Sequence, residues 1–279
     1  MRAIEVQSVR VPAFMYGTAW KQDDTARCVL DAIRVGFRAV DTANQRKHYF
    51  EQGVGDGLAR AQAEGVERAA LFLQTKFTYR RGQDHRLPYD PRADVATQVA
   101  QSFARSLEHL RTTWIDSLVL HGPELRRGLT DKDWRVWGAM ERLKAQGVVR
   151  LLGISNVARD QLEALCRGAT HPPAFVQNRC YARTGWDRAI RASCRARGVI
   201  YQGFSLLTAN RKELAGPSFR RLCVRRSRTP AQVVFRFAQQ LGMLPLTGTT
   251  DPEHMREDLH GLDFELTPDE VAQIEALAV

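Results

Sequence analysis

Residues 94–121 read DVATQVAQSFARSLEHLRTTWIDSLVLH, an amphipathic segment followed by a short apolar run. Asp94 stands directly before the amphipathic part and is a residue type that caps helices, so a helix is predicted over 94–110. The run DSLVLH (116–121) has the length and composition of a buried strand. A helix that leads into such a strand is typical of a βαβ unit and therefore indicates a parallel sheet.

The same alternation of strand-like and helix-like segments extends along the chain. Eight short runs are rich in Val, Ile, Leu and Phe: MYGTA (15–19), FRAVDTA (37–43), ALFLQTK (70–76), DSLVLH (116–121), RLLGISN (150–156), AFVQN (174–178), VIYQGFS (199–205) and MLPLTG (243–248). Amphipathic segments such as 23–36 and 132–147 lie between them, and both end at Gly. Eight such units without a linker predict an α/β fold, a (β/α)₈ TIM barrel that forms a single domain over residues 1–279.

The two ends of the chain complete this prediction. Val9, Val11 and Phe14 alternate with polar or small residues, so the first thirteen residues are expected to form a short hairpin across the barrel floor. The segment 266–279 begins with Thr and Pro before an amphipathic pattern and predicts a final capped helix.

The net charge of +10 raises the question of nucleic-acid binding, because clustered Lys and Arg neutralise phosphates. Much of the excess is Arg scattered through helical patterns, and the dense run 220–228 has no aromatic residue that could stack on bases. We therefore expect a solvated helix surface there and no nucleic-acid partner. The charge remains compatible with the phosphates of a small cofactor.

Cysteine usage and hydropathy indicate the compartment. The five cysteines form no CxxC pair and no cluster at ligand spacing, so neither a disulfide framework nor a metal site is predicted. A reduced, cytoplasmic chain is the expected setting. The N-terminal MRAIEVQSVR lacks the apolar core of a signal peptide, and no run of eighteen apolar residues occurs, so no membrane association is expected.

In a barrel of this type the catalytic groups lie where the strands end and the βα loops begin. Asp41, Lys76 and His121 end neighbouring predicted strands, so their side chains are expected to share one mouth. A buried Asp and a buried Lys on adjacent strands would pair. Tyr49, eight residues after Asp41, would then lie beside Lys76, whose positive charge is expected to lower the phenol pKa and make it a proton donor.

The motifs along the chain resemble those of the aldo-keto reductases, in the family's order and over essentially the whole length. They are GTAW (17–20), GFRAVDTA (36–43) followed by E-x-x-VG (51–55), QTK (74–76), LVLHGP (118–123), GISN (153–156), FVQN (175–178), GFS (203–205) and PLTGTTDPEHMRED (245–258). The resemblance implies hydride transfer from a reduced nicotinamide cofactor to an aldehyde or ketone.

The resemblance also implies roles for individual residues. Asp41, Tyr49, Lys76 and His121 match the catalytic tetrad, with Tyr49 protonating the nascent alkoxide and His121 orienting the carbonyl oxygen. Ser155, Asn156 and Gln177 would hold the nicotinamide carboxamide, and Phe204 would stack on its ring. Further expected cofactor contacts are Thr18, Ser205, Leu207, Thr247, Gly248, Thr249, His254 and Arg256. Expected substrate contacts are Trp20, His48 and Tyr181.

Two departures from the family pattern leave alternatives open. The segment between Asp41 and Val54 is longer than usual, so His48 competes with Tyr49 for the position of the acid. In the predicted phosphate site, Leu246-Thr247 stands where NADPH-dependent members carry Lys-Ser, and His254 or Arg256 must replace an arginine. We expect NADP(H) as the cofactor, and NAD(H) stays open.

Two other functions compete with the carbonyl reductase. One is a regulatory or accessory barrel that binds the cofactor with little turnover; the presence of all four tetrad residue types disfavours it. The other is a lyase with Lys76 as a Schiff-base nucleophile, which a neighbouring Asp41 would oppose by keeping the amine protonated. An open site that accepts varied carbonyl compounds is expected, because the chain ends soon after its last helix. The resemblance also implies a monomer.

Overall fold

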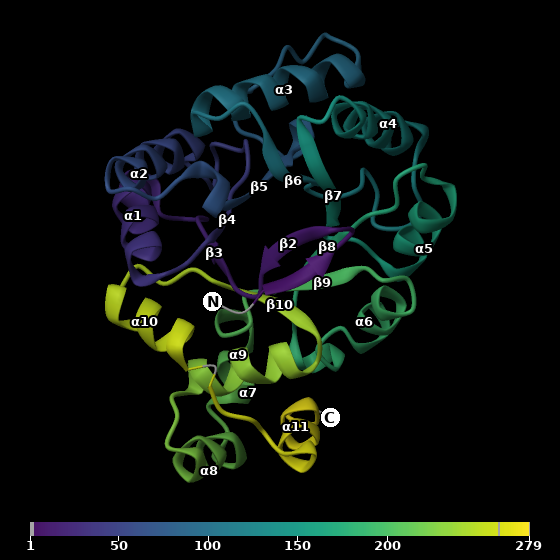
Figure 1. Ribbon diagram of the computed structural model, residues 1–279. Helices are drawn as coiled ribbons and strands as arrows, with labels where there is room; N and C mark the ends of the chain where they lie inside the picture. The colour runs from purple at the N-terminus through teal and green to yellow at the C-terminus, as the bar shows by residue number, and fades with distance from the viewer. Residues whose placement is uncertain (1–2, 262, 279) are drawn as a thin grey trace.

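The computed structural model describes residues 3–261 and 263–278 (Figure 1). Residues 1–2, 262 and 279 lie outside the described residues. All four belong to the predicted domain, and residue 279 also belongs to the predicted final helix. Within the described part, none of the helices has the length and apolar character needed to cross a membrane.

Eight parallel strands close into a barrel, which confirms the predicted (β/α)₈ fold. They are β3 (Met15–Gly17), β4 (Ala39–Asp41), β5 (Phe72–Phe77), β6 (Ile115–Leu120), β7 (Val149–Ser155), β8 (Phe175–Arg179), β9 (Ile200–Phe204) and β10 (Met243–Thr247). Each overlaps one of the eight predicted runs. Neighbours in sequence are neighbours in the barrel, and β10 pairs with β3 to close it, with Leu246 opposite Met15.

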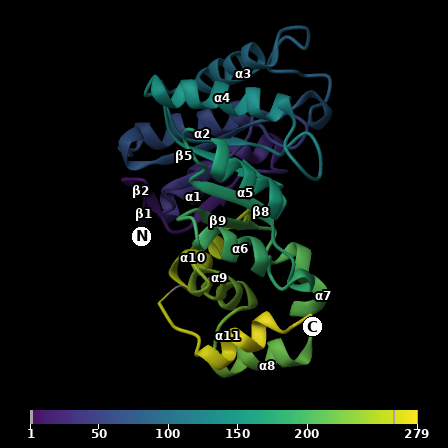
Figure 2. The same cartoon turned by 90° about the vertical axis from the view of Figure 1, so that its right-hand side faces the viewer.

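Helices surround the barrel and follow its strands in turn (Figures 1 and 2). They are α1 (Thr25–Val35), α2 (Glu51–Ala63), α3 (Val95–Leu110), α4 (Asp131–Ala145), α5 (Arg159–Gly168), α6 (Arg188–Arg195), α7 (Arg211–Leu214), α8 (Pro217–Arg226), α9 (Pro230–Gln240), α10 (Pro252–His260) and α11 (Pro268–Glu275). In both views α8 and α11 lie side by side, on the opposite side of the barrel from α3, and Gln273 of α11 donates to Ser218 of α8.

The helix ends occur close to where the sequence predicts them. The Asp94 side chain accepts hydrogen bonds from the backbone N–H groups of Ala96 and Thr97, which starts α3 as expected. Gly36 ends α1 with a φ of 122°, a conformation that residues with a Cβ rarely adopt. Thr267 caps α11 by accepting from the backbone of Glu270. The predicted helix 132–147 is found as α4, which begins and ends slightly earlier.

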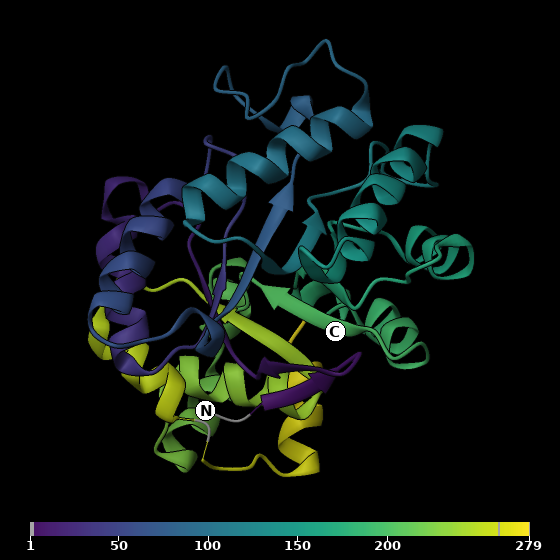
Figure 3. The same cartoon turned by 45° about the horizontal axis from the view of Figure 1, so that its top comes forward.

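The predicted N-terminal hairpin is present and covers one end of the barrel. Strands β1 (Ala3–Val6) and β2 (Val9–Pro12) pair antiparallel and lie across the ring of barrel strands (Figures 1 and 3). The side chains of Val6, Val9 and Val11 are buried and pack in one cluster with Leu151, Phe175 and other residues near the starts of the barrel strands. The hairpin therefore closes the floor, and the carboxyl ends of the strands are left for a site at the opposite end.

Candidate active site

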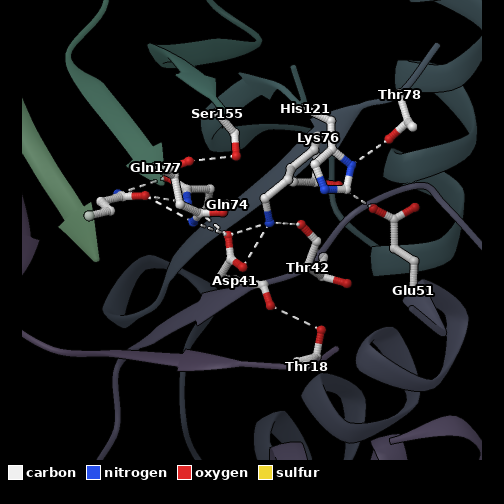
Figure 4. Close-up of polar contacts among 12 residues, drawn as sticks. Thr18, Asp41, Thr42, Glu51, Gln74, Lys76, Thr78, His121, Ser155 and Gln177 are labelled. Atoms are coloured by element: carbon white, nitrogen blue, oxygen red, sulfur yellow. Dashed lines mark hydrogen bonds and ion pairs between the residues drawn. The ribbon is translucent and has the colours of Figure 1, made fainter. Parts of the chain in front are cut away.

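Asp41 and Lys76, at the ends of the neighbouring strands β4 and β5, form a buried ion pair (Figure 4). The Lys76 Nζ lies 2.7 Å from both Asp41 carboxylate oxygens and 2.8 Å from the backbone oxygen of Thr42. These contacts use all three donors of the ammonium group. Burial lowers the Lys76 pKa, and the charge of Asp41 opposes that change.

A layer of glutamine side chains inside the barrel holds the Asp41 carboxylate in place. Gln74 and Gln177 donate to Asp41 Oδ1 over 2.8 and 3.0 Å. Gln202 accepts a hydrogen bond from each of these two amides, over 2.8 and 3.0 Å. Sequence reasoning assigned only Gln177 to the site; Gln74 and Gln202 were missed, although their alternation within predicted strands placed them on the inner face.

Tyr49, and not His48, lies against the Lys76–Asp41 pair. The Lys76 Nζ is 5.1 Å from the centroid of the Tyr49 ring, and the His121 ring meets Tyr49 edge-on with centroids 5.9 Å apart. His48 stacks instead on Trp20, at 4.1 Å between ring centroids. The longer β4–α2 loop therefore brings the phenol to the ammonium group and leaves the imidazole at the rim.

The Tyr49 pKa differs from the expectation in its direction. Burial raises the pKa of Tyr49 well above its ordinary value, and the negative charge of Asp41 adds to this rise. The predicted lowering by Lys76 is thus wrong for this arrangement, because burial of the phenol and the charge of Asp41 both act in the opposite direction. The phenol is consequently protonated at neutral pH.

His121 follows β6 and is held in a neutral state. Its Nδ1 lies 2.7 Å from the Thr78 hydroxyl, so Nε2 is the ring nitrogen left for a ligand (Figure 4). Burial lowers the His121 pKa to about 3, and the positive charges of Lys76 and His48 contribute. At neutral pH the imidazole can therefore donate a hydrogen bond without carrying a charge.

Glu51, the first residue of α2, connects the Tyr49 loop to the Lys76 strand. Its buried carboxylate accepts from the Thr75 hydroxyl, directly before Lys76, and lies 3.1 Å from His109 Nδ1 of α3. Glu51 comes two residues after Tyr49, so this contact fixes the loop relative to β5. Sequence reasoning quoted Glu51 within a motif but assigned it no role.

A cavity of about 970 Å³ extends from this mouth to the β10–α10 loop. Its volume is at the upper end of the range for small-molecule sites. The predicted site residues that line it are Trp20, Asp41, Tyr49, His121, Ser155, Gln177, Phe204, Ser205, Leu207, Thr247, Gly248, Thr249 and His254. Most of the residues that were expected to be catalytic or to contact cofactor and substrate therefore lie along one cavity.

A comparison with models of known protein families shows to which family the chain belongs. The model of the aldo/keto reductase family matches residues 13–279. The chain belongs to the aldo/keto reductase family. This membership confirms the resemblance read from the motifs and supports an oxidoreductase activity with a nicotinamide cofactor.

Individual relatives are similar over nearly the whole chain. An aldo-keto reductase of Mycolicibacterium vanbaalenii is 29% identical over 255 residues, which are 91% of this chain and 83% of the relative. Glyoxal reductase of Bacillus subtilis is 27% identical over 255 residues, 91% of this chain and 84% of the relative. The crystal structure of an aldo/keto reductase from Brucella melitensis has a TM-score of 0.84 at 23% identity, covers 99% of both chains and shares the fold.

Other residues expected from the family pattern lie outside the cavity lining. The Thr18 hydroxyl is buried and donates to the Asp41 backbone oxygen over 3.0 Å. Asn156 donates to the His121 backbone oxygen over 2.8 Å, and two arginine guanidinium groups lie over the Tyr181 ring. Arg256 is exposed and pairs with Glu253. Of the two candidates for the family's phosphate-binding arginine, the cavity therefore contains only His254.

In the loop after β10, one hydroxyl group that was expected to contact the cofactor phosphate is already bound within the protein. Thr247 was expected to face phosphate oxygens, but its hydroxyl donates over 2.6 Å to the buried carboxylate of Asp258. The backbone of the loop is also held by strand β3, since the Tyr16 hydroxyl donates to the Thr249 backbone oxygen over 2.8 Å. The loop is thus held by the barrel before any ligand binds.

Lys21 is a cavity residue that sequence reasoning missed. It is 6% exposed, and its Nζ donates to the Gly248 backbone oxygen over 2.7 Å; no carboxylate of the described residues pairs with it. Burial lowers the Lys21 pKa to about 8. Its position one residue after the predicted GTAW motif could have identified it. A buried lysine without a counter-charge is suited to an anionic ligand.

Trp20, Asn156 and Ser205, which follow three different barrel strands, share an unusual backbone. Their φ angles are 65°, 52° and 56°, in the left-handed region that residues with a Cβ seldom occupy. Such conformations persist where the surrounding structure imposes them, and they cluster at functional sites. Their position at the carboxyl ends of the strands agrees with a site at this end of the barrel.

Proposed function

We propose that the protein is an NADP(H)-dependent carbonyl reductase that converts aldehydes or ketones to alcohols, with Tyr49 as the proton donor. The observation that carries the proposal is the contact of the Tyr49 ring with Lys76 Nζ and the His121 ring, in the wall of the long cavity. Asp41 holds Lys76 in this position.

The residues of the cavity fit a nicotinamide dinucleotide. Ser155, Gln177 and Phe204 line the mouth, where polar groups and an aromatic face suit a carboxamide and its ring. Lys21, further along the same cavity, is a buried cation without a carboxylate partner among the described residues. The cavity then reaches the backbone of 248–250 before α10. A helix start with free N–H groups suits phosphate oxygens.

The chain's own residues would manage the proton. A bound reduced nicotinamide supplies the hydride. Tyr49 keeps its proton at neutral pH because burial raises its pKa, and it would release this proton to an alkoxide, which is a stronger base than a phenolate. When Thr78 donates to His121 Nδ1, the proton of the neutral imidazole is on Nε2, from which it can hydrogen-bond a carbonyl oxygen.

The substrate would be a small carbonyl compound that enters past Trp20. This side chain is 70% exposed at the rim of the cavity and could act as an apolar wall. The Bacillus subtilis relative is named for glyoxal, which is an aldehyde. Together these observations favour an open site that accepts varied aldehydes and ketones.

The proposal is tested by turnover. Purified protein is mixed with NADPH or NADH and an activated aldehyde such as nitrobenzaldehyde, and the loss of the reduced cofactor is followed by absorbance. We expect oxidation of NADPH, and its loss in Tyr49→Phe while the variant still binds the cofactor. Cofactor binding without turnover over a broad panel of carbonyls would instead favour the regulatory barrel.

The geometry disfavours the lyase alternative. A Schiff-base lysine must present an unprotonated amine to its substrate. The Lys76 Nζ is bound by Asp41 and Thr42, and Lys76 does not line the cavity. Covalent trapping of a carbonyl compound on Lys76 by borohydride would revive this alternative.

We also propose that the protein acts as a monomer in a reducing compartment, the cytoplasm. All five cysteines are free thiols, and four of them are buried in the barrel and helix core. An unchanged sedimentation coefficient over a wide range of protein concentrations, with five thiols titrated after unfolding, is the expected result.

A further inference from the structure

The end of the cavity away from Tyr49 is lined by two exposed arginines that the family motifs do not predict. Arg211 begins α7 and Arg220 lies in α8, and both line the cavity together with the start of α9 at 229–231 and with His254 of α10. These segments lie far from Tyr49 in the sequence. They enclose the part of the cavity that a dinucleotide would reach with its phosphate-bearing half.

Within the described part of the chain, Arg211 and Arg220 have no side-chain partner, in contrast to the arginines at and just after the end of α8. Arg225 and Arg226 lie within ion-pair distance of Glu270, and Arg228 lies 3.2 Å from Asp263. The two cavity arginines are therefore available to a ligand, whereas the three arginines outside the cavity stabilise the packing of α8 against the C-terminal segment.

The acidic residues of the same cavity do not neutralise these arginines. Asp258 accepts the Thr247 hydroxyl, and burial raises its pKa to about 6. Glu257 also lines the cavity, but its side chain has no ion pair with Arg211 or Arg220. The first turn of α9 adds the positive end of a helix to this region. Lys21 adds a further cation nearer the mouth.

We infer that Arg211 and Arg220 form a phosphate subsite for the dinucleotide cofactor. This inference rests on the proposed function and names which residues take the place of the family's phosphate-binding arginine. Arg256 lies outside the cavity and is paired with Glu253, so it does not fill that role. A guanidinium group presents parallel donors that match phosphate oxygens. The phosphate is either the 2′-phosphate of NADPH or the pyrophosphate that NADPH and NADH share.

The experiment measures binding, independently of turnover. Dissociation constants for NADPH and for NADH are determined by tryptophan fluorescence at low and high salt, with wild type, Arg211→Gln, Arg220→Gln and the double variant. Arg221→Gln is the matched control, because Arg221 is the next residue of the same helix, is also exposed, and does not line the cavity. Thermal unfolding of each variant verifies folding.

We expect each cavity variant to weaken binding roughly three- to tenfold at low salt, with a smaller effect at high salt, and the control to change less than about twofold. A loss confined to NADPH assigns the 2′-phosphate to the arginines, and an equal loss for both cofactors assigns the pyrophosphate. Wild-type affinity in the double variant, or an equal loss in Arg221→Gln, would overturn the subsite. Failure of the proposed function would look different, because wild type would then bind cofactor without oxidising it, or bind none.

Discussion

Lys76 Nζ lies 2.7 Å from each carboxylate oxygen of Asp41, with both side chains almost fully buried. A pair of this kind is costly to desolvate, and its value depends on every polar atom being satisfied. The amides of Gln74 and Gln177 and the backbone oxygen of Thr42 meet that requirement. The buried pair is therefore a rigid, charged group at the bottom of the site, and the Tyr49 ring packs against its Lys76 end.

Asp41→Asn should leave Lys76 buried without a counter-charge. We expect a loss of about 3 kcal/mol in the free energy of unfolding, because breaking one half of a buried pair costs much more than the pair contributes. Chemical denaturation provides the measurement. Asp56→Asn, which removes an exposed pair with Arg111, is the control and should cost less than about 1 kcal/mol. Equal stabilities of Asp41→Asn and wild type would contradict a buried ion pair.

Tyr49→Phe and His48→Gln should separate the two candidates for the proton donor. Because Tyr49 contacts Lys76 and His121 while His48 stacks on Trp20, we expect kcat to fall by about 10² or more in Tyr49→Phe and only a few-fold in His48→Gln. Steady-state kinetics at saturating cofactor measure both. The reverse ranking would assign the acid to His48.

Glu51→Ala should shift the position of the Tyr49 side chain, because Glu51 anchors the backbone two residues after it. The variant loses the contacts that tie the start of α2 to Thr75 and His109, so we expect kcat to fall about tenfold while the dissociation constant of the cofactor stays close to that of wild type. Glu51→Gln, which can still accept from Thr75, should recover part of the rate. Glu108→Ala, from an exposed pair with Arg105, serves as the control. If Glu51→Gln and Glu51→Ala were equally slow, the charge of Glu51 would matter more than its position.

Lys21 should make cofactor affinity depend on pH. Burial lowers its pKa to about 8, from an ordinary value near 10.4, so the folded protein binds fewer protons than the unfolded chain between these values. The contribution of Lys21 to stability therefore rises with pH from about 8 to about 10. Phosphate binding requires the charged form, so affinity for the cofactor should fall as pH rises through about 8 in wild type. Lys21→Met should bind more weakly and without this slope.

A direct titration measures the affinity of both proteins for NADPH from pH 7 to pH 9.5. The scaffold is the same in both, so groups other than Lys21 contribute equally to the two curves. Parallel pH dependences in wild type and Lys21→Met would show that another group binds the phosphate.

The barrel itself follows from local features of the sequence. The eight apolar runs, the Asp94 and Thr267 caps and the helix end at Gly36 each act within a few residues, and each is found where the sequence predicts it. The floor hairpin follows from the alternation of Val9 and Val11 in the same way. The carboxyl ends of the parallel strands lie on one side of the barrel, so the strand pattern alone predicts that Asp41 and Lys76 share one mouth.

Only the tertiary structure decided which side chains of distant segments touch, because the spacing of residues along the chain does not predict these contacts. Whether His48 or Tyr49 reaches Lys76 depends on the path of a lengthened loop, which Glu51 anchors through residues of β5 and α3. The direction of the Tyr49 pKa depends on how deeply the fold buries the phenol and how close it brings the charge of Asp41. Arg220 reads as one arginine in a basic run, and only the fold shows that it lines the cavity while Arg225 and Arg226 pair with Glu270. The sequence by itself determined the strands, the caps and the residues at the strand ends, because hydrogen bonding and hydrophobic periodicity act locally. Only the folded structure determined which group pairs with each charged side chain. Coulomb and desolvation energies depend on distances in space, and the order of residues along the chain does not set these distances.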